Sequence, residues 1–216
     1  MTEIILVRHG QATSQATDEA GYDRLSALGV QQAEWLGEHL RATNPHFDRV
    51  LTGTLKRQIG TAEAMGYGEC ERDPRLDELS YFALAQAVEA QHGFPAPRDA
   101  TEFARYLPQV ITHWAEGTLT GLPESFDEFT TRVEAVIGEV TGAGGRVLVV
   151  TSGGVIGMVM RHAFGLGIPG LSKVMLQVMN SSLHRVHHVH ETLMVGAFNT
   201  TPHLDTPERA HARTFI

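Results

Sequence analysis

Two short polar clusters, each placed directly after an apolar run, carry the side chains best suited to chemistry in this chain. Arg8 and His9 follow the run 4–7, and Ser152 and Gly153 follow the run 147–150. A guanidinium can hold two oxygens of an anion at once, and an imidazole can act as a nucleophile or a base near neutral pH. Glycines at a helix start leave backbone N–H groups free for an anion. These residue types together favour a site for an anionic substrate.

Each cluster also has a simpler explanation. A buried strand can end in polar residues such as Arg8 and His9, and a glycine pair can mark a tight turn from a strand into a helix. Arg57, in the first turn of a helix predicted near 56–65, is by itself typical of a solvated side chain. Placed near Arg8 it would instead form a bidentate clamp on a phosphate. Short motifs are hypotheses, so on these residues alone both interpretations stay open.

The elements that would position these residues are short apolar runs between helical segments. Strands are predicted at 4–7, 49–52 and 146–151, because each run is rich in β-branched residues and bounded by turn residues. Helices are predicted after Ser26, which would cap the first one, and near 56–65 and 155–164. Asn44-Pro45 would stop the first helix. Strands alternating with helices predict a mainly parallel sheet, whose ligands bind at the carboxyl ends of the strands.

The rest of the chain is harder to interpret. Residues 11–25 and 70–77 look like polar loops, while 84–90, 101–116 and 125–140 have helical spacing. The stretch 66–125 is expected to form an extra helical layer above the sheet. Two strand-like runs, 181–190 and 192–198, predict an antiparallel hairpin at one side of the sheet. The pattern therefore predicts one α/β domain over 1–216 with an antiparallel edge.

Composition narrows the classes of protein and partner. The chain has 216 residues, 42% of them hydrophobic, which suits one domain with a substantial core. No apolar run approaches the ~20 residues of a membrane span, and no signal peptide is expected. A net charge of −8 argues against nucleic acid or an anionic membrane as partner. The single cysteine, Cys70, suits a reducing cytoplasm. The oligomeric state is not indicated.

Over nearly its whole length the sequence resembles the histidine phosphatase superfamily, in its phosphoglycerate-mutase-like branch. The resemblance depends on several segments that occur in the family's order. They are Arg8-His9-Gly10-Gln11-Ala12, Leu25-Ser26-Ala27-Leu28-Gly29 with Gln32-Ala33, Leu55-Lys56-Arg57 with Thr61-Ala62, Leu76-Asp77-Glu78, Glu124-Ser125 with Arg132, Asn180-Ser181-Ser182, and Phe198-Asn199 with Pro202-His203-Leu204. The resemblance implies a three-layer α/β sandwich with a helical insertion, 66–125, over the active site as a lid.

The resemblance also implies a mechanism without a metal or other cofactor. His9 would attack the phosphorus of a small phosphorylated substrate, and water would hydrolyse the resulting phosphohistidine. Arg8 and Arg57, with Ser152 and Gly153, would bind the phosphate oxygens. Glu78 would protonate the leaving oxygen and later take a proton from water. Asp77 is the competitor for this acid role. The natural substrate cannot be named from the sequence.

One position departs from the family pattern. The family has a second histidine where this chain has Ser152, in the turn Thr151-Ser152-Gly153-Gly154. A hydroxyl donates one hydrogen bond but lacks the charge of an imidazolium. We therefore expect weak hydrolysis with phosphate binding retained. A phosphate- or phosphoprotein-binding module with impaired catalysis is the alternative, and a phosphoglycerate mutase, which would need the second histidine most, is less favoured.

Four further histidines fall within the run 181–190. Strand alternation would place His184, His188 and His190 on one face, with His187 on the other. Such a face would suit a surface metal site, but no Asp, Glu or Cys framework accompanies it beyond Glu191. A half-exposed strand face is the favoured interpretation, and no metal is expected.

Overall fold

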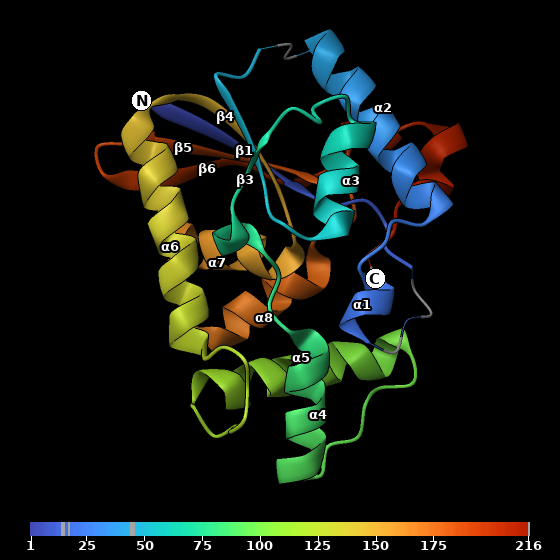
Figure 1. Cartoon of the computed structure of the whole chain (residues 1–216), viewed down its shortest axis with the longest axis vertical. Coiled ribbons are helices and arrows are strands. Elements are labelled where there is room, and N and C mark those ends of the chain that lie inside the picture. The colour runs from blue at the N-terminus through green and yellow to red at the C-terminus, as the bar shows by residue number, and fades with distance from the viewer. Residues whose placement is uncertain (14–15, 17, 44–45, 216) are drawn as a thin grey trace.

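The computed structural model describes residues 1–13, 16, 18–43 and 46–215, and within them one six-stranded sheet forms the centre of the molecule (Figure 1). The strand order is β3-β2-β4-β1-β5-β6. The first four strands of that order run parallel, while β5 pairs antiparallel with both β1 and β6. The predicted mainly parallel sheet with an antiparallel edge is confirmed. The strands are β1 Thr2–Arg8, β2 Arg49–Thr52, β3 Glu71–Arg72, β4 Gly145–Thr151, β5 Leu183–Val189 and β6 Thr192–Thr200.

Helices connect the parallel strands and extend beyond their carboxyl ends. The first predicted helix is α2, and those predicted near 56–65, 84–90, 101–116, 125–140 and 155–164 are α3 to α7. The helices are α1 Glu19–Tyr22, α2 Ala27–Thr43, α3 Lys56–Ala64, α4 Tyr81–His92, α5 Ala100–Ala115, α6 Phe126–Ala143, α7 Gly153–Phe164 and α8 Ile168–Gln177. Short 3₁₀ helices lie at Pro74–Leu76, Pro202–Leu204 and Pro207–Ala212.

The two faces of the sheet are covered by different helices. On one face Ile5 and Val7 of β1 pack in a cluster with residues of α2 and α3. On the other face Ile4 and Leu6 pack in a larger cluster with residues of α6 and α7. Alternation along β1 therefore produces three layers, helix on sheet on helix. It also sends the side chain of Arg8 toward the α6–α7 side and that of His9 toward α3.

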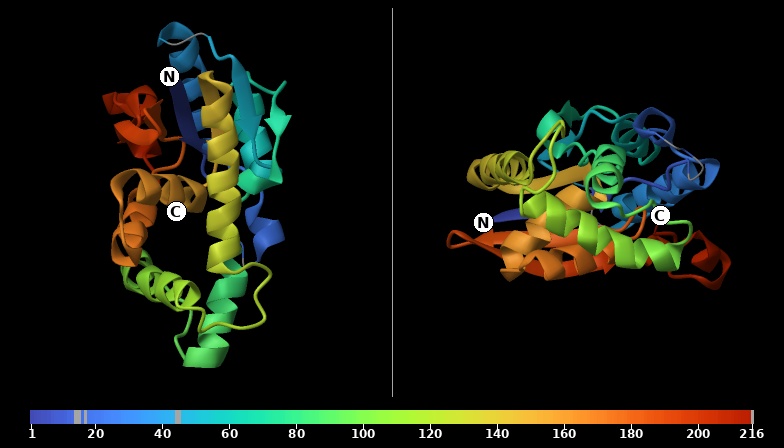
Figure 2. Two further views of the ribbon diagram at one scale, coloured as in Figure 1. Left: turned by 90° about the vertical axis from the view of Figure 1, so that its left-hand side faces the viewer. Right: turned by 90° about the horizontal axis from the view of Figure 1, so that it is seen from below.

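The helices α4 and α5 lie at one end of the molecule, beyond the carboxyl ends of the parallel strands (Figure 1). In the left view of Figure 2 these green helices again lie at the lower end, and in the right view, from below, they lie in front of the sheet. The helix α5 packs against α8 and against α4. The stretch 66–125 thus contains the expected helices, but they lie at one end of the sheet and not above it, and the same stretch also contributes the edge strand β3. No helix in the described ranges is both long enough and apolar enough to cross a membrane.

A close backbone contact fixes the loop after β1 against α2. A Cβ at Gly10 would lie 2.2 Å from the carbonyl oxygen of Gly29, and a Cβ at Gly29 would lie 2.1 Å from that of Gln11, so both positions need glycine. The Ser26 hydroxyl accepts a hydrogen bond from the Gly29 N–H at 3.0 Å, as expected of the residue capping this helix. The helix ends at Thr43, and the predicted stop, Asn44-Pro45, lies outside the described residues.

Three local predictions are corrected by the structure, and one helix was not predicted. The loop predicted at 11–25 contains α1, whose N-terminus is capped by the Asp18 carboxylate. The loop predicted at 70–77 contains the short strand β3 and a 3₁₀ turn. The helix α8 had no predicted counterpart. The hairpin is confirmed, but β5 ends before His190, which lies in the turn with a φ of 47° and so is not on the strand face predicted for it.

Candidate active site

The carboxyl ends of β1 and β4 bring two of the sequence-predicted residues side by side. Arg8 is in register with Thr151, and the His9 N–H donates a hydrogen bond of 2.9 Å to the Thr151 carbonyl. His9 and Ser152 are therefore the next residues along two adjacent parallel strands. Both are buried, with exposed fractions of 1% and 0%. The strand pairing itself sets the distance between these two side chains.

The His9 imidazole is held in one orientation. Its Nδ1 lies 2.7 Å from the Gly10 carbonyl oxygen, which can only accept, so Nδ1 carries the hydrogen. The lone pair is then on Nε2, where the Arg57 Nε–H approaches at 3.3 Å. Burial, followed by the positive charges of Arg57 and Arg8, holds the pKa of His9 well below its usual value. The imidazole is thus neutral, with its Nε2 lone pair turned toward Arg57, and this protonation state is the one a nucleophile needs.

The position of Arg57 depends on α1, which the sequence did not reveal. The Asp23 carboxylate accepts from Nη1 of Arg57 at 3.2 Å and from its backbone N–H at 3.1 Å. The Tyr22 ring stands 5.0 Å from the guanidinium carbon and meets the His9 ring edge-on. Arg57 is only 2% exposed, so this ion pair is shielded from solvent. Asp23 and Tyr22 are two site residues that sequence reasoning missed.

Arg8 lies on the other side of β1 and is only partly paired. Its Nη1 donates to the carbonyl oxygens of Val178 and Phe215. Its Nε is buried and has no hydrogen-bond partner among the described residues. A Cβ added to Gly153 would lie 3.7 Å from this Nε and 3.9 Å from a carboxylate oxygen of Glu78. The start of α7 therefore lies between Arg8 and Glu78.

Glu78 occupies the N-terminus of α7. Both carboxylate oxygens accept from the Gly154 N–H, at 3.0 and 3.1 Å, and one also accepts from the Leu79 N–H. A Cβ at Gly154 would lie 2.2 Å from the carboxylate, so glycine is needed there for this contact. Asp77 is held elsewhere, because its carboxylate accepts from the backbone N–H and the hydroxyl of Thr54. The structure thus brings Glu78, not Asp77, to the helix start beside Arg8.

Ser152 has a partner that the sequence did not indicate. The Gln58 side-chain amide donates a hydrogen bond of 2.8 Å to the Ser152 hydroxyl oxygen, and Gln58 is fully buried. Gln58 follows Arg57 directly in α3. The adjacency of an arginine and a glutamine in a first helical turn was the only available sequence signal, and it does not by itself reveal a buried contact.

The short helix α1 also approaches the start of α4. The Glu19 carboxylate accepts from the Phe82 N–H at 3.1 Å, and the Tyr22 and Phe82 rings are 6.3 Å apart. Burial raises the pKa of Glu19, while the Phe82 N–H acts in the opposite direction. The beginning of α4 therefore lies next to the residues around His9, and Glu19 adds a carboxylate to Asp23 and Glu78.

The histidines of the hairpin do not form a second cluster of ligands. His184 is buried, and its Nδ1 accepts from the Asn199 N–H while Nε2 contacts the Ser182 hydroxyl. Burial lowers its pKa to about 3. Within the described part of the chain, no group of three or more His, Cys, Asp or Glu side chains is placed to hold a metal ion.

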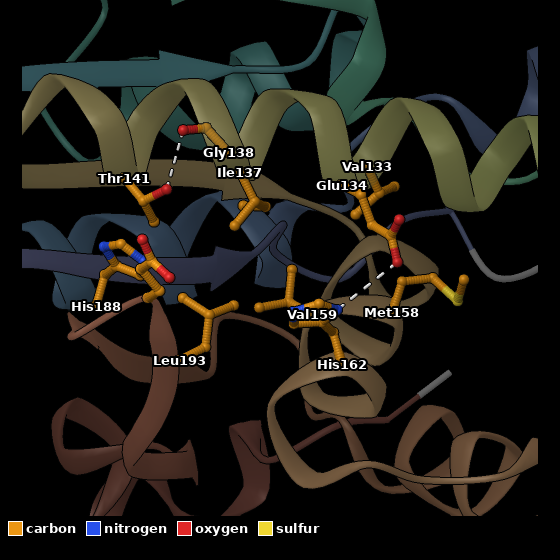
Figure 3. Close-up of a pocket in the computed structure, with 11 residues that line it drawn as sticks. Val133, Glu134, Ile137, Gly138, Thr141, Met158, Val159, His162, His188 and Leu193 are labelled. Atoms are coloured by element: carbon orange, nitrogen blue, oxygen red, sulfur yellow. Dashed lines mark hydrogen bonds and ion pairs between the residues drawn. The ribbon is translucent and has the colours of Figure 1, made fainter.

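A separate pocket of about 230 Å³ lies between α6, α7 and the β5–β6 hairpin (Figure 3). Val133, Ile137 and Val159 form apolar parts of its wall, and His188 faces it from β5. At its rim His162 lies 3.7 Å from Glu134. None of the residues predicted from the sequence as catalytic or phosphate-binding lines this pocket.

Comparisons with known proteins identify the family and the fold. The sequence model of the histidine phosphatase superfamily (branch 1) matches residues 4–201. A broad-specificity phosphatase of Saccharomyces cerevisiae is 26% identical over 216 aligned residues, which cover 95% of this chain and 88% of the yeast protein. The chain is thus similar to a curated phosphatase over almost its full length.

Solved structures show the same fold. A phosphoglycerate mutase from Bacillus anthracis str. Sterne superposes with a TM-score of 0.67 at 22% identity, covering 94% of both chains. A phosphoserine phosphatase from Entamoeba histolytica, in complex with 3-phosphoglyceric acid, superposes with a TM-score of 0.66 at 19% identity. That match covers 94% of this chain and 100% of the other. The predicted phosphoglycerate-mutase-like architecture is confirmed.

Proposed function

The chain belongs to the histidine phosphatase superfamily, and from this premise we propose that it hydrolyses small phosphate monoesters through a phosphohistidine at His9. The observation that carries the proposal is the state of the imidazole. Its Nδ1 hydrogen is directed to the Gly10 carbonyl, so the Nε2 lone pair is the nucleophile, and the lowered pKa keeps this lone pair available.

The proposed reaction has two displacement steps. In the first, His9 Nε2 forms a bond to phosphorus, the bond to the ester oxygen breaks, and Glu78 gives that oxygen a proton. In the second, water attacks the phosphorus, Glu78 takes a proton from the water, and the phosphorus–nitrogen bond breaks to release phosphate. The position of Glu78 beside Gly153 and Arg8 supports this role over one for Asp77. No metal or other cofactor is part of the mechanism.

The charge of the transferred group would be balanced by Arg8 and Arg57. The Arg57 Nε–H now points at the lone pair of His9, so an incoming phosphoryl oxygen would take that donor as His9 attacks. The Nε of Arg8, which has no partner within the described part of the chain, supports a second contact. The Gly153 and Ser152 positions, next to Arg8 and His9, would complete the phosphate site.

A phosphate- or phosphoprotein-binding module is the second candidate. The neutral Ser152–Gln58 pair favours it, because the site there offers no charged donor where the family has a histidine. A phosphoglycerate mutase is less favoured for the same reason. The substrate is proposed to be small and anionic, with no role for nucleic acid or a membrane, and the cytoplasm is the proposed location. The segment 66–125 is proposed to act as the lid, since α4 begins beside Tyr22.

The test is a panel of phosphate monoesters incubated with the protein under chelator, followed by rapid quench. We expect slow release of phosphate and an acid-labile, base-stable phosphoenzyme that His9→Ala cannot form. Hydrolysis that survives in His9→Ala would overturn the proposal. Tight binding of phosphate esters with no turnover and no phosphoenzyme would instead establish the binding module.

A further inference from the structure

Two adjacent residues of α3 contact two adjacent strand ends. Arg57 donates to Nε2 of His9 after β1, and Gln58 donates to Oγ of Ser152 after β4. Because His9 and Ser152 follow neighbouring parallel strands in register, the two contacts lie next to each other. The contact between Arg57 and His9 already has a proposed role in the reaction. The contact between Gln58 and Ser152 is built in the same way, and its role has still to be explained.

Ser152 stands at the N-cap of α7 but does not cap it. A serine there usually accepts from a backbone N–H of the first turn, yet its side chain makes no such hydrogen bond. The Gly154 N–H is bound by Glu78 instead. Capping therefore does not account for the serine, whose hydroxyl is turned toward Gln58.

We infer that Gln58 is a positioning residue that makes the Ser152 hydroxyl a hydrogen-bond donor to the transferred phosphoryl group. This inference rests on the function proposed above. The Gln58 amide hydrogen occupies a lone pair of Ser152 Oγ, so the hydroxyl hydrogen cannot point back at Gln58. Among the described residues that hydrogen has no acceptor. It is left for an oxygen of a phosphoryl group bound at His9, on the neighbouring strand.

The orientation of the Gln58 amide is fixed by its other contacts. Its nitrogen also donates to the Leu76 carbonyl at 3.0 Å, and its oxygen accepts from the Leu55 N–H at 3.4 Å. Reversing the amide would set two oxygens against each other at Leu76. A Cβ at Gly53 would lie 1.9 Å from the amide oxygen, so the glycine leaves room for it. Gln58 therefore presents a donor, not an acceptor, to Ser152.

A structural role for Gln58 can be separated from this positioning role. The Leu76 carbonyl also accepts from the Thr151 hydroxyl at 2.6 Å, so it keeps a partner when Gln58 is replaced. Replacement by methionine preserves most of the side-chain volume and removes the donor. The loss in unfolding free energy should then be modest, while the loss of a directed hydroxyl should appear in kcat.

The experiment is a double-mutant cycle on a phosphate monoester, with variants Gln58→Met, Ser152→Ala and the double variant. Loss of one preorganised donor typically costs about 10²-fold in rate, so we expect Ser152→Ala to lower kcat by about that factor with a smaller change in KM. Gln58→Met should lower kcat by about tenfold in the native background. In the Ser152→Ala background it should change kcat less than about twofold, because its effect passes through the serine.

A second variant tests the direction of the hydrogen bond. Gln58→Glu keeps the shape, but an ionised carboxylate can only accept, so it would take the hydroxyl hydrogen away from the phosphoryl group. We expect Gln58→Glu to lower kcat at least as much as Gln58→Met, with partial recovery as the pH falls and the carboxylate is protonated. Equal kcat for Gln58→Glu and the native protein across the pH range would overturn the inference.

Affinity for orthovanadate, which mimics the transferred phosphoryl group, separates this inference from the proposed function. Suppose that the native protein hydrolyses no ester, but that Gln58→Met weakens vanadate binding only when Ser152 is present. The proposed hydrolysis then fails and the positioning role stands. If the native protein is active but the losses from Gln58→Met and Ser152→Ala simply multiply, the inference fails alone. Loss of thermal stability with unchanged kcat in Gln58→Met would also overturn it.

Discussion

The two halves of the proposed phosphate site, Arg57 with His9 and Gln58 with Ser152, share one construction and differ in charge. In one half Arg57 donates to His9, and in the other Gln58 donates to Ser152. Both donors come from the first turn of α3, both acceptors end strands of the parallel sheet, and all four side chains are buried. The backbone therefore presents two equivalent positions, to which the sequence assigns a charged pair and a neutral pair.

The difference shows which task each half can perform. Burial, and after it the positive charges of Arg57 and Arg8, lower the pKa of His9, so the imidazole stays neutral, as the proposed nucleophilic attack requires. An amide beside a hydroxyl fixes the direction of one neutral hydrogen bond and adds no charge. Charge-assisted hydrogen bonds are about twice as strong as neutral ones, so stabilisation of the transferred group should be weaker in the second half. We therefore expect the site to support attack by His9 better than it stabilises the charge of the transferred phosphoryl group.

Removal of the proposed general acid, Glu78, should lower turnover more than any other change considered. Glu78→Gln is expected to lower turnover of alkyl phosphates, which have poor leaving groups, by about 10²–10⁴-fold. Aryl phosphates need no proton on the leaving oxygen, so their loss should be much smaller. The measurement is kcat over a series of esters of differing leaving-group pKa.

Asp77→Asn is the matched control for Glu78→Gln. Its carboxylate is bound to Thr54, so the variant should affect alkyl and aryl phosphates equally, through stability. A loss in Glu78→Gln that is equal for all leaving groups would remove Glu78 from the acid role. A dependence on the leaving group in Asp77→Asn would transfer the role to Asp77.

Removal of the Arg57 charge should cause the next largest loss of activity. Arg57→Ala is expected to lower kcat/KM by about 10²–10³-fold, because a preorganised donor at the transferred group is lost. This loss should exceed that of Gln58→Met, the corresponding change in the neutral half. Arg146→Ala is a suitable control, since Arg146 pairs with Glu3 near the opposite end of β4 and should leave kcat/KM unchanged. Equal losses for Arg57→Ala and Gln58→Met would contradict the comparison.

The parallel core of the fold could be predicted because its signals are local. Runs such as 147–150 are apolar and β-branched, and each is followed at once by the polar residues that matter. Since carboxyl ends of parallel strands share one edge, His9 and Ser152 could be expected together before any contact was known. The hairpin was equally clear from its two strand-like runs.

The residues that hold the site could not be predicted, because their partners are distant in sequence. The helix α1 has four residues, too few for a periodic pattern. Asp23, which follows it, is recognised as a site residue only from its ion pair with Arg57. A glutamine in a first helical turn, such as Gln58, is typical of a surface position. The 66–125 segment showed helical spacing, but its place over the strand ends depends on contacts such as that between Tyr22 and Phe82.

A histidine at position 152 should raise activity only when Gln58 is replaced as well. Ser152→His alone places a ring where the Gln58 amide now lies 2.8 Å from Oγ, so we expect no gain or a loss. With Gln58→Ala in addition, the ring has room, and kcat/KM should rise by about tenfold, or ~1.4 kcal/mol. A crystal structure of the double variant with bound phosphate would verify the placement of the ring. A correctly placed ring without a gain would mean that Ser152 does not limit the rate.

The smallest expected effect is a shift of the pH profile that reports on the charged half alone. Attack requires neutral His9, and burial with the charges of Arg57 and Arg8 lowers its pKa. In the native protein, phosphoenzyme formation should therefore lose no activity to protonation of His9 near pH 6.5, where an ordinary histidine is half protonated.

Replacement of Arg57 by glutamine removes one positive neighbour, which raises the pKa of His9 and moves the acid limb to higher pH. With each profile normalised to its own value at pH 8, the activity of the variant should begin to fall at a higher pH than that of the native protein as the pH is lowered. An aryl phosphate makes the proton from Glu78 unnecessary, and titration of the substrate cancels between two proteins assayed on the same ester. Superposable profiles would show that the Arg57 charge does not reach the nucleophile. Arg57 would then act only through its hydrogen bonds to the phosphate, and not through the pKa of His9.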